Sequence, residues 1–357
     1  MLSLGIDIHK MNGVVAVKDD EGRLVDRFSF SNDKEGIIQL TSRIHSFNDQ
    51  IQEVMESTGN YWIGVYEALE SEGIRVVLAN PVKTRIIAES RIKSDRLDAS
   101  LLADLLRANL IAECYVPRKE VRSIRALVRH RVTLVKMRTQ IKNRIHTILD
   151  KHNVTYQHGI FTKVGLEWLQ SLELPEIDRA LLTSNLQALS NIESLIEENN
   201  HQIAKVALND EKVNLLMGFT GIDYYTAVLL LYEIADIKRF PSPKKLISWA
   251  GLAPSLHQSG DVCRTGGITK TGNKWVRWIL CQAAHKACLY DPKLSRFYQR
   301  VSARRGENKA VTAVARKMLV SVYHVLSRNE PYHGERSDLR RLKTNKLKRR
   351  VLTDFHV

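Results

Sequence analysis

Four acidic residues in the first hundred positions have the types and spacing of a metal-dependent phosphoryl-transfer site. Asp7 interrupts the apolar segment 4–8, where a carboxylate is costly to bury without a cation. Glu56 closes a second apolar segment, and Asp95 and Asp98 stand three residues apart, on one face of a helix. Such hard oxygen donors suit Mg²⁺ or Mn²⁺, and two of these ions roughly 4 Å apart stabilise the attacking and leaving oxygens on phosphorus.

Each acid also has a purely structural interpretation. Asp95 and Asp98 suit the first turn of a helix, where negative charge opposes the helix dipole, and Glu56 suits a solvated strand end. Asp7 is harder to explain in this way because isoleucines flank it on both sides. The set therefore indicates a metal site more strongly than any one member does.

The elements that must position these acids follow from hydrophobic periodicity. Three consecutive strands are predicted, followed by alternating helices and strands, an order typical of an α/β ribonuclease-H-like domain. Actin-like ATPases and sugar kinases share that core, but His9-Lys10 replaces their Gly-Thr turn and residues 1–110 contain no second glycine-rich phosphate loop. The predicted strands are 2–8, 13–17, 24–30, 52–55 and 75–79, and the predicted helices are 37–47, 61–72 and 97–110.

Beyond Pro117 the period becomes helical. Apolar residues recur every seven positions from Leu127 to Ile148 and again from Leu182 to Ile203, which predicts two long helices. They either fold back on each other as an antiparallel coiled-coil arm, pair with another copy of the chain, or belong to an ordinary bundle. The first is strongly basic on its polar faces, so we expect it to lie along a phosphate backbone.

The remainder of the chain offers a turn, a loop and a possible thiol site. Residues 216–222 resemble a helix-hairpin-helix turn that meets phosphate through backbone N–H groups, or form a tight turn that needs glycine. Residues 255–273 are a loop by composition, and 274–289 a helix. The four cysteines are expected to be free thiols. The spacing of Cys281, His285 and Cys288 permits a metal, although core packing is favoured.

Charge indicates a polyanionic partner. The chain has 54 lysines and arginines against 39 acids, a net charge of +15, with 44% hydrophobic residues, which excludes a disordered basic protein. The excess concentrates in residues 118–151 and 336–350, and the last 25 residues are expected to form a poorly ordered basic tail. No apolar run is long enough to span a membrane and no secretory signal is visible, so we expect a cytoplasmic, nucleoid-associated protein.

Short motifs along residues 1–330 resemble, as a group, the insertion-sequence one-ten family of DEDD transposases. The motifs are Gly5-Ile6-Asp7-Ile8-His9-Lys10, Met55-Glu56-Ser57-Thr58-Gly59-Asn60-Tyr61, Lys93-Ser94-Asp95-Arg96-Leu97-Asp98-Ala99, Trp249-Ala250-Gly251-Leu252-Ala253-Pro254, Gln258-Ser259-Gly260 and Ile268-Thr269-Lys270-Thr271-Gly272-Asn273.

The resemblance implies a prokaryotic site-specific recombinase with four parts. Residues 1–115 would be a RuvC-like domain whose acids Asp7, Glu56, Asp95 and Asp98 bind Mg²⁺, and 116–210 a coiled-coil arm. Residues 211–332 would be a mainly helical transposase domain with Ser259 as nucleophile, and 333–357 the basic tail. It further implies donor and target DNA, a structured noncoding bridge RNA that pairs with both, and a homo-oligomer, dimer to tetramer, whose subunits share a composite site.

The residues around Ser259 agree with that role. A serine hydroxyl needs a base, a metal or positive charge to become a nucleophile, and cations follow Ser259 within 18 residues. A phosphoserine link conserves bond energy, so strands can be rejoined without ATP. Ser255 is the alternative candidate for the nucleophile. The cations expected to contact nucleic acid are Arg118, Arg122, Arg125, Arg129, Arg131, Lys136, Arg138, Lys142 and Arg144 on the first long helix, and Lys270, Lys274 and Arg277 after the serine.

Two other functions remain open. A metal-dependent junction resolvase or nuclease would use the same acids to activate water, leaving Ser259 structural. A non-enzymatic nucleic-acid-binding protein would use the acids only as helix caps.

Overall fold

The computed structural model describes residues 1–47, 49–56, 59–87, 95–259, 262–335 and 337–352. For residues 85–87, 95–97, 256–259 and 262–265 the backbone alone is described. The chain divides into two compact units, Met1–Pro117 and Arg118–Val357.

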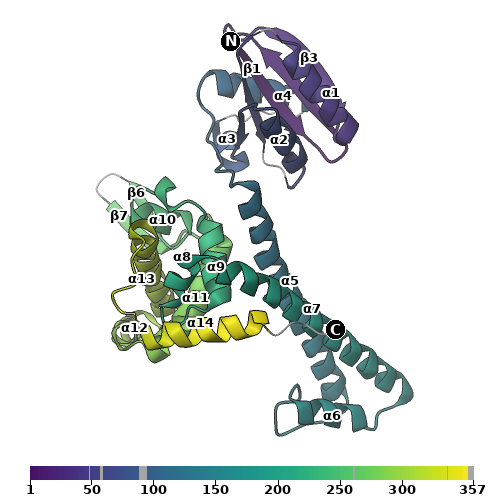
Figure 1. Ribbon diagram of the computed structural model, residues 1–357, viewed down its shortest axis with the longest axis vertical. Coiled ribbons are helices and arrows are strands. Elements are labelled where there is room, and N and C mark those ends of the chain that lie inside the picture. Colours follow the sequence, from purple (N-terminus) through teal and green to yellow (C-terminus); the bar gives the residue numbers. More distant parts are fainter. Residues whose placement is uncertain (48, 57–58, 88–94, 260–261, 336, 353–357) are drawn as a thin grey trace. The chain divides into compact units, whose positions relative to one another are not determined.

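The first unit is a mixed α/β domain, as expected. Figure 1 shows the sheet of this unit, with β1 and β3 labelled, together with its helices. The strand order is β3-β2-β1-β4-β5, in which β1 pairs antiparallel with β2 and parallel with β4. The order of elements agrees with the sequence prediction, apart from the additional helix α3. The elements are β1 (Leu2–Ile8), β2 (Asn12–Lys18), β3 (Leu24–Ser31), α1 (Lys34–His45), β4 (Ile51–Glu56), α2 (Trp62–Ser71), β5 (Val76–Ala79), α3 (Pro81–Ile87) and α4 (Asp95–Arg107).

Helix α4 packs against β1 on the face of the sheet that carries Asp7. A Cβ added to Gly5 would lie 2.0 Å from the carbonyl oxygen of Ala99 and 2.6 Å from the amide nitrogen of Ala103. Glycine is therefore required at Gly5 because the helix backbone approaches the strand there. On the opposite face, Leu4, Ile6 and other apolar residues form the main core with α1 and α2.

The close approach at Gly5 yields a stability prediction. Gly5→Ala is expected to destabilise the first unit by about 1–3 kcal/mol, since the methyl group must displace helix backbone. Urea unfolding measures the difference. Gly64→Ala is the control, because the nearest atom to a Cβ at that helical position is Ile37 Cδ1, at 3.7 Å. Equal stability of the two variants would contradict the close packing of α4 on β1.

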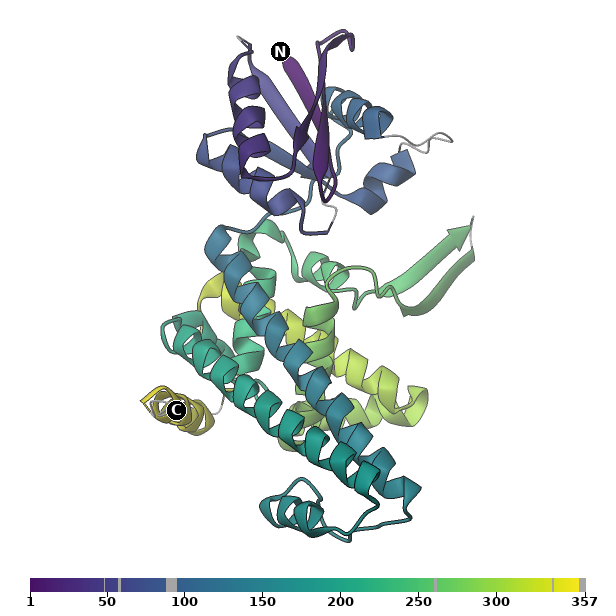
Figure 2. The same cartoon turned by 90° about the vertical axis from the view of Figure 1, so that its right-hand side faces the viewer.

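The second unit is mostly helical. Its two longest helices have 33 residues each and pair antiparallel, because Lys151 contacts Asp178 near one end and Arg131 contacts Asn200 near the other (Figure 2). The elements are α5 (Lys119–Lys151), α6 (Lys163–Ser171), α7 (Glu176–Leu208), α8 (Glu211–Met217), α9 (Tyr224–Ile234), η1 (Ile237–Arg239), α10 (Pro243–Trp249), β6 (Pro254–Ser259), β7 (Val262–Ile268), α11 (Lys274–Tyr290), α12 (Pro292–Arg305), α13 (Glu307–Arg328) and α14 (Ser337–Leu352).

The seven-residue pattern therefore corresponds to contact between α5 and α7 within one chain. Leu134, Ile148 and Leu189 are buried between the helices, and the arm ends in a polar cluster. There Asp178 accepts hydrogen bonds from Lys151 at 2.9 Å and approaches His152 Nε2 at 2.8 Å. The Lys151 ammonium, followed by His152, lowers the pKa of the Asp178 carboxyl.

Two expectations for the second unit are wrong. Residues 255–273, expected to be a loop, lie mostly in β6 and β7, which pair antiparallel as a hairpin. The Ser/Gly/Thr-rich composition concealed this backbone pairing. The basic tail, expected to be poorly ordered, forms helix α14 between residues 337 and 352, which packs against α7 and α8. Within the described parts of the chain, no helix is long and apolar enough to cross a membrane.

Helix α14 is held by its own charged side chains. The Lys343 ammonium donates to the carbonyl oxygens of Met217, Phe219 and Ile222 at 2.8–2.9 Å. Burial lowers the pKa of Lys343 to about 8. Since Leu347 on the same face is only 2% exposed, the helix combines one apolar anchor with a buried cation that binds carbonyl groups.

Candidate functional site

The backbone brings Asp7 and Glu56 to the same edge of the sheet, the one formed by the carboxyl ends of the neighbouring strands β1 and β4. In the parallel pair β1–β4, Ile6 is opposite Met55, so Asp7 and Glu56, one residue further on each strand, are level with each other. Residues level on neighbouring strands face the same side of a sheet. Asp7 is 8% exposed, and its Oδ2 lies 3.2 Å from His9 Nε2.

Helix α4 brings the other two acids toward that edge. Its residue Asp104 pairs with Lys18, which lies opposite Ser3 at the start of β1, whereas Ala99 lies over Gly5. The helix therefore runs antiparallel to β1, and its first turn, Asp95 to Asp98, lies toward the carboxyl ends of the strands. The side chain of Asp95 is outside the described part, whereas that of Asp98 is half-buried.

The described side chains do not form a preassembled metal cage. Among them, no group of three or more His, Cys, Asp or Glu residues is arranged to hold a metal ion. Without a cation between them, like-charged carboxylates repel one another. The acids can therefore lie at the same end of the sheet without closing around a metal ion. The donor chemistry fits a hard divalent ion: three described carboxylates, of Asp7, Glu56 and Asp98, are carried by two neighbouring strands and the helix that covers them.

Glu53 is a buried acid on β4, and it lies on the opposite face of the sheet from Glu56. It lies opposite Leu4, is 0% exposed, and its two carboxylate oxygens have no hydrogen-bond partner among the described groups. Burial raises the pKa of Glu53 to about 8. Because strand residues alternate between faces, Glu53 belongs to the core under α1 and α2.

The raised pKa of Glu53 predicts how stability depends on pH. The folded protein binds a proton that the unfolded chain releases near pH 4.5, so stability is fully present below that pH and falls until about pH 8. The slope is about 1.4 kcal/mol per pH unit at most. Glu53→Gln is expected to remove this decrease, as measured by urea unfolding at pH 5, 6.5 and 8. Parallel pH profiles of variant and wild type would contradict the burial of a protonated Glu53.

Ser259 is the last residue of β6 and pairs across the hairpin with Val262. Its side chain, and those of Cys263 and Arg264, are outside the described part, as are Gly260 and Asp261 entirely. Figure 2 shows the hairpin extending away from the helices of its own unit. The backbone of Ser259 therefore lies at the end of β6 that is farther from those helices.

The expected cations divide into two groups. Exposed members are Arg118, Lys136, Arg144, Lys270 and Lys274. Half-buried members that contact protein groups are Arg125 on the Tyr232 and Glu233 carbonyls, Arg129 on the Glu233 carboxylate, Arg131 on Asn200, Lys142 near Glu193 and Arg277 on the Ala250 carbonyl. Arg122 and Arg138 are half-buried as well. The first group has its charge available for phosphate.

The turn between α8 and α9 packs inside the second unit. Gly221 has φ +85°, and a Cβ there would lie 2.4 Å from the carbonyl oxygen of Ala283 in α11. The carboxylate of Asp223 caps α9 by accepting from the amide of Thr226. Glycine is thus required both for the turn and for the approach of α11, and one N–H group at this helix start is already bonded.

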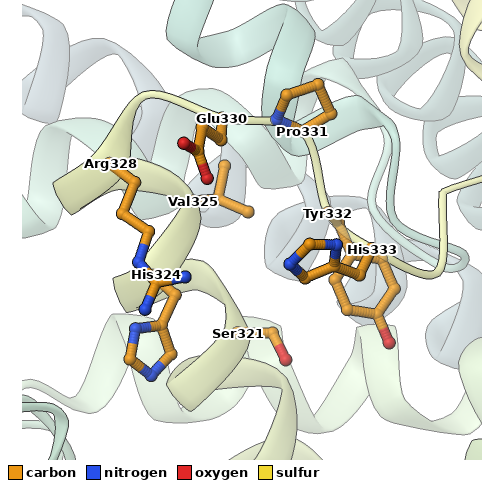
Figure 3. A pocket seen from close by; sticks show the side chains of 8 residues that line it. All are labelled: Ser321, His324, Val325, Arg328, Glu330, Pro331, Tyr332 and His333. Carbon is orange, nitrogen blue, oxygen red and sulfur yellow. The ribbon is translucent and has the colours of Figure 1, made fainter.

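Two further features lie apart from these residues. Cys288 is buried in the core and Cys281 packs against it, as the predicted core packing of this helix requires, whereas His285 is exposed. A pocket of about 160 Å³ at the end of α13 is shown in Figure 3. It contains none of the predicted site residues; its polar lining is Ser321, His324, Arg328, Glu330, Tyr332 and His333.

Comparison with known proteins identifies the class of this protein. A family model described as a transposase, of the DEDD type, matches residues 4–154. A second, described as the transposase IS116/IS110/IS902 family, matches residues 213–299. The two matches include every predicted catalytic residue. The protein is a DNA transposase.

Relatives that match over most of their length are consistent with both family matches. A putative transposase, y4qE, of Sinorhizobium fredii is 27% identical over 330 residues, covering 91% of this chain and 81% of the relative. The transposase for insertion sequence element IS1111A of Coxiella burnetii is 28% identical over 291 residues, 78% of each chain. A pilin gene-inverting protein of Moraxella bovis is 27% identical over 318 residues, 85% of this chain and 89% of the relative. The chain belongs to the IS110 family of transposases. A non-enzymatic role is therefore not retained.

Proposed function

We propose that this transposase exchanges DNA strands through a covalent intermediate on Ser259, together with a divalent ion held by Asp7, Glu56, Asp95 and Asp98. The observation that carries the proposal is the level register of Asp7 and Glu56 beneath the first turn of α4. The strand order β3-β2-β1-β4-β5 supports a ribonuclease-H-like, RuvC-like fold for this domain. The DEDD type of the matching family supports dependence on a divalent metal.

The covalent step is a transesterification. The Ser259 oxygen attacks a DNA phosphorus, a phosphoserine bond forms, and the bond to one deoxyribose oxygen breaks, so that strand leaves with a free hydroxyl. A hydroxyl of the incoming strand then attacks the same phosphorus and releases the serine. The number of phosphoester bonds is unchanged, so no ATP is needed. Exposed Lys270 and Lys274, which follow the hairpin, can balance the charge of the phosphorane-like transition state.

The acids of the first unit have a separate task. Asp7, Glu56 and Asp98 would hold Mg²⁺ or Mn²⁺ together with Asp95. Bound there, the ion supplies positive charge to oxygens on phosphorus. The acids themselves position that charge at the edge of the sheet, and the enclosed position of Asp7 fixes one ligand in the strand.

Nucleic acids and further copies of the chain complete the proposal. Donor and target DNA, and a structured noncoding bridge RNA that pairs with both, would contact the exposed cations of α5. A homo-oligomer, dimer to tetramer, would combine the acids of one subunit with the serine of another. Purification of the protein with its bound nucleic acid, followed by sequencing, tests the RNA: recovery of DNA alone would contradict it.

The covalent step is tested by identifying the adduct. A DNA substrate is incubated with the protein and Mg²⁺. The mixture is then digested to nucleotides and peptides and analysed by mass spectrometry. We expect a nucleotide mass on the peptide that contains Ser259. Metal-dependent nicks with free ends and no modified peptide would instead support the second candidate, a hydrolytic junction resolvase that uses the same acids with water.

The division of the basic residues predicts different salt dependences. Lys136→Ala and Arg144→Ala, at exposed sites, are expected to lower the slope of log K against log salt by about 0.9 each on duplex DNA. Arg131→Ala is expected to change that slope little, because its guanidinium is bonded to Asn200 and lies over the Tyr225 ring. Equilibrium binding between 50 and 300 mM salt measures all three. Identical slopes would contradict this division.

A further inference from the structure

A buried carboxylate joins three elements near the base of the hairpin. Glu233, in α9, is 0% exposed. Its two oxygens accept hydrogen bonds from Nε and Nη2 of Arg129 in α5, at 2.7 and 2.8 Å. Oε2 also accepts from Nδ2 of Asn273, the residue before α11, at 2.7 Å. An enclosed charge is tolerated only with such partners, so the three side chains act as one structural group.

A second arginine strengthens the link to α5. Arg125, one turn before Arg129, donates from Nε to the carbonyl oxygen of Tyr232 and from Nη2 to that of Glu233, both at 2.7 Å. The Arg129 guanidinium also lies over the ring of Trp275, 5.5 Å from its centroid. The basic helix is therefore fixed to the end of α9 and to the first turn of α11.

Asn273 connects this group to the hairpin. Its Oδ1 accepts from the backbone amides of Trp275 and Val276, which caps α11, and its backbone N–H donates to the carbonyl oxygen of Trp249 at 2.9 Å. Gly272 before it has φ +111°, and a Cβ there would lie 2.1 Å from the same carbonyl oxygen. Asn273 thus bonds to Glu233 through Nδ2, to the first turn of α11 through Oδ1 and to Trp249 through its backbone N–H.

The two segments that enter and leave the hairpin are bonded to each other at this point. The amide of Thr269 donates to the carbonyl oxygen of Ala253, and that of Lys270 to the carbonyl oxygen of Gly251. The hairpin projects from this base (Figure 2). A small rotation at the base would therefore move its far end, where Ser259 lies, by a larger distance.

We propose that Glu233 is a positioning residue for strand exchange: through Arg129 and Asn273 it fixes the base of the β6–β7 hairpin relative to the basic helix α5. The inference rests on the proposed function, because it relates the nucleophile to the surface that holds nucleic acid. Misplacement of a reacting group by about 1 Å costs about 100-fold in rate, whereas binding by exposed cations is unaffected by it.

The test uses a charge exchange. Glu233→Gln keeps the size of the side chain but removes its charge. Asn273→Asp keeps the cap of α11 but faces Glu233 with a second carboxylate. The double variant Glu233→Gln/Asn273→Asp restores one carboxylate and one amide in exchanged positions. Glu193→Gln, which removes an exposed acid that pairs with Lys142, is the matched control.

Three measurements on the full chain decide the outcome. For Glu233→Gln we expect the rate of Ser259–DNA adduct formation at saturating DNA to fall at least tenfold, and the DNA dissociation constant to change less than threefold. Hydrogen exchange of amides in residues 249–254 and 268–273 should accelerate. The double variant should recover both the adduct rate and the slow exchange, and Glu193→Gln should match the wild type.

Other results overturn the inference. If adduct formation and affinity fall together, Glu233 acts through DNA binding. If the adduct rate falls while exchange at the hairpin base is unchanged, or the double variant recovers neither, Glu233 does not act through Asn273. If the wild type forms no adduct, the proposed function fails, and the hydrogen-exchange comparison alone then decides whether Glu233 fixes the hairpin base.

Discussion

Ser259→Ala is expected to lower strand exchange by about 10⁴-fold or more and to abolish the covalent protein–DNA adduct, because removal of a nucleophile leaves only binding and charge stabilisation. DNA affinity should stay within about threefold of the wild type, since the exposed cations that hold the backbone are unchanged. A gel assay that follows both adduct and recombined product on one labelled substrate measures the two effects together.

Ser255→Ala is the matched control for that experiment. Ser255 lies four residues earlier on the same strand, and its hydroxyl lies against Gly266, where a Cβ would be 2.4 Å from it. Its replacement is expected to leave adduct formation intact. If Ser255→Ala loses the adduct and Ser259→Ala keeps it, the nucleophile has been assigned to the wrong serine.

The sequence could predict the α/β unit because its elements are encoded locally. Short apolar runs, such as the one around Asp7, alternate with amphipathic segments, and periodicity alone separates strands from helices there. The long helices were predictable for the same reason: the apolar positions of α7 recur every seven residues, and Leu182, Leu189, Ile196 and Ile203 are all buried. Which partner they pack against is not a local property.

The elements that the sequence did not predict depend on distant groups. Hairpin β6–β7 is held by backbone pairing, and Gly266 and Gly267 weaken the strand signal in the sequence. Helix α14 appeared as a solvated tail because Leu347 is its one fully buried apolar residue among the described ones. The carbonyl groups that bind Lys343 lie more than 120 residues earlier.

The same limit applies to the site residues. The acids were recognisable because a carboxylate inside an apolar strand is unusual, and register then brought Asp7 and Glu56 level. Arg125 and Arg129 appeared as surface cations because their partners in α9 lie more than 100 residues away in sequence. The residue in the sequence that could have indicated this ion pair is Glu233, because it lies in an otherwise apolar helix. A buried acid requires a cation, and the long basic helix supplies several.

Asp7→Asn and Glu56→Gln are each expected to lower metal-dependent strand cleavage by about 10²–10⁴-fold. Each replaces a charged ligand at the edge of the sheet by a neutral one of equal size, which weakens the charge that a divalent ion needs and can be partly offset by raising Mg²⁺ or Mn²⁺. Cleavage rates across a range of metal concentrations measure the effect, and DNA affinity should change little, since neither acid holds phosphate directly.

Two control variants test whether the loss of metal-dependent cleavage is specific to the acids of the predicted metal site. Glu53→Gln changes an acid on the same strand that faces the opposite core, and Asp104→Asn changes an acid at the other end of α4 that pairs with Lys18. Both should retain the wild-type dependence of cleavage on metal. If the Asp7 and Glu56 variants also retain it, the four acids do not form the metal site. If they lose cleavage but still form the Ser259 adduct, the metal serves a step other than serine attack.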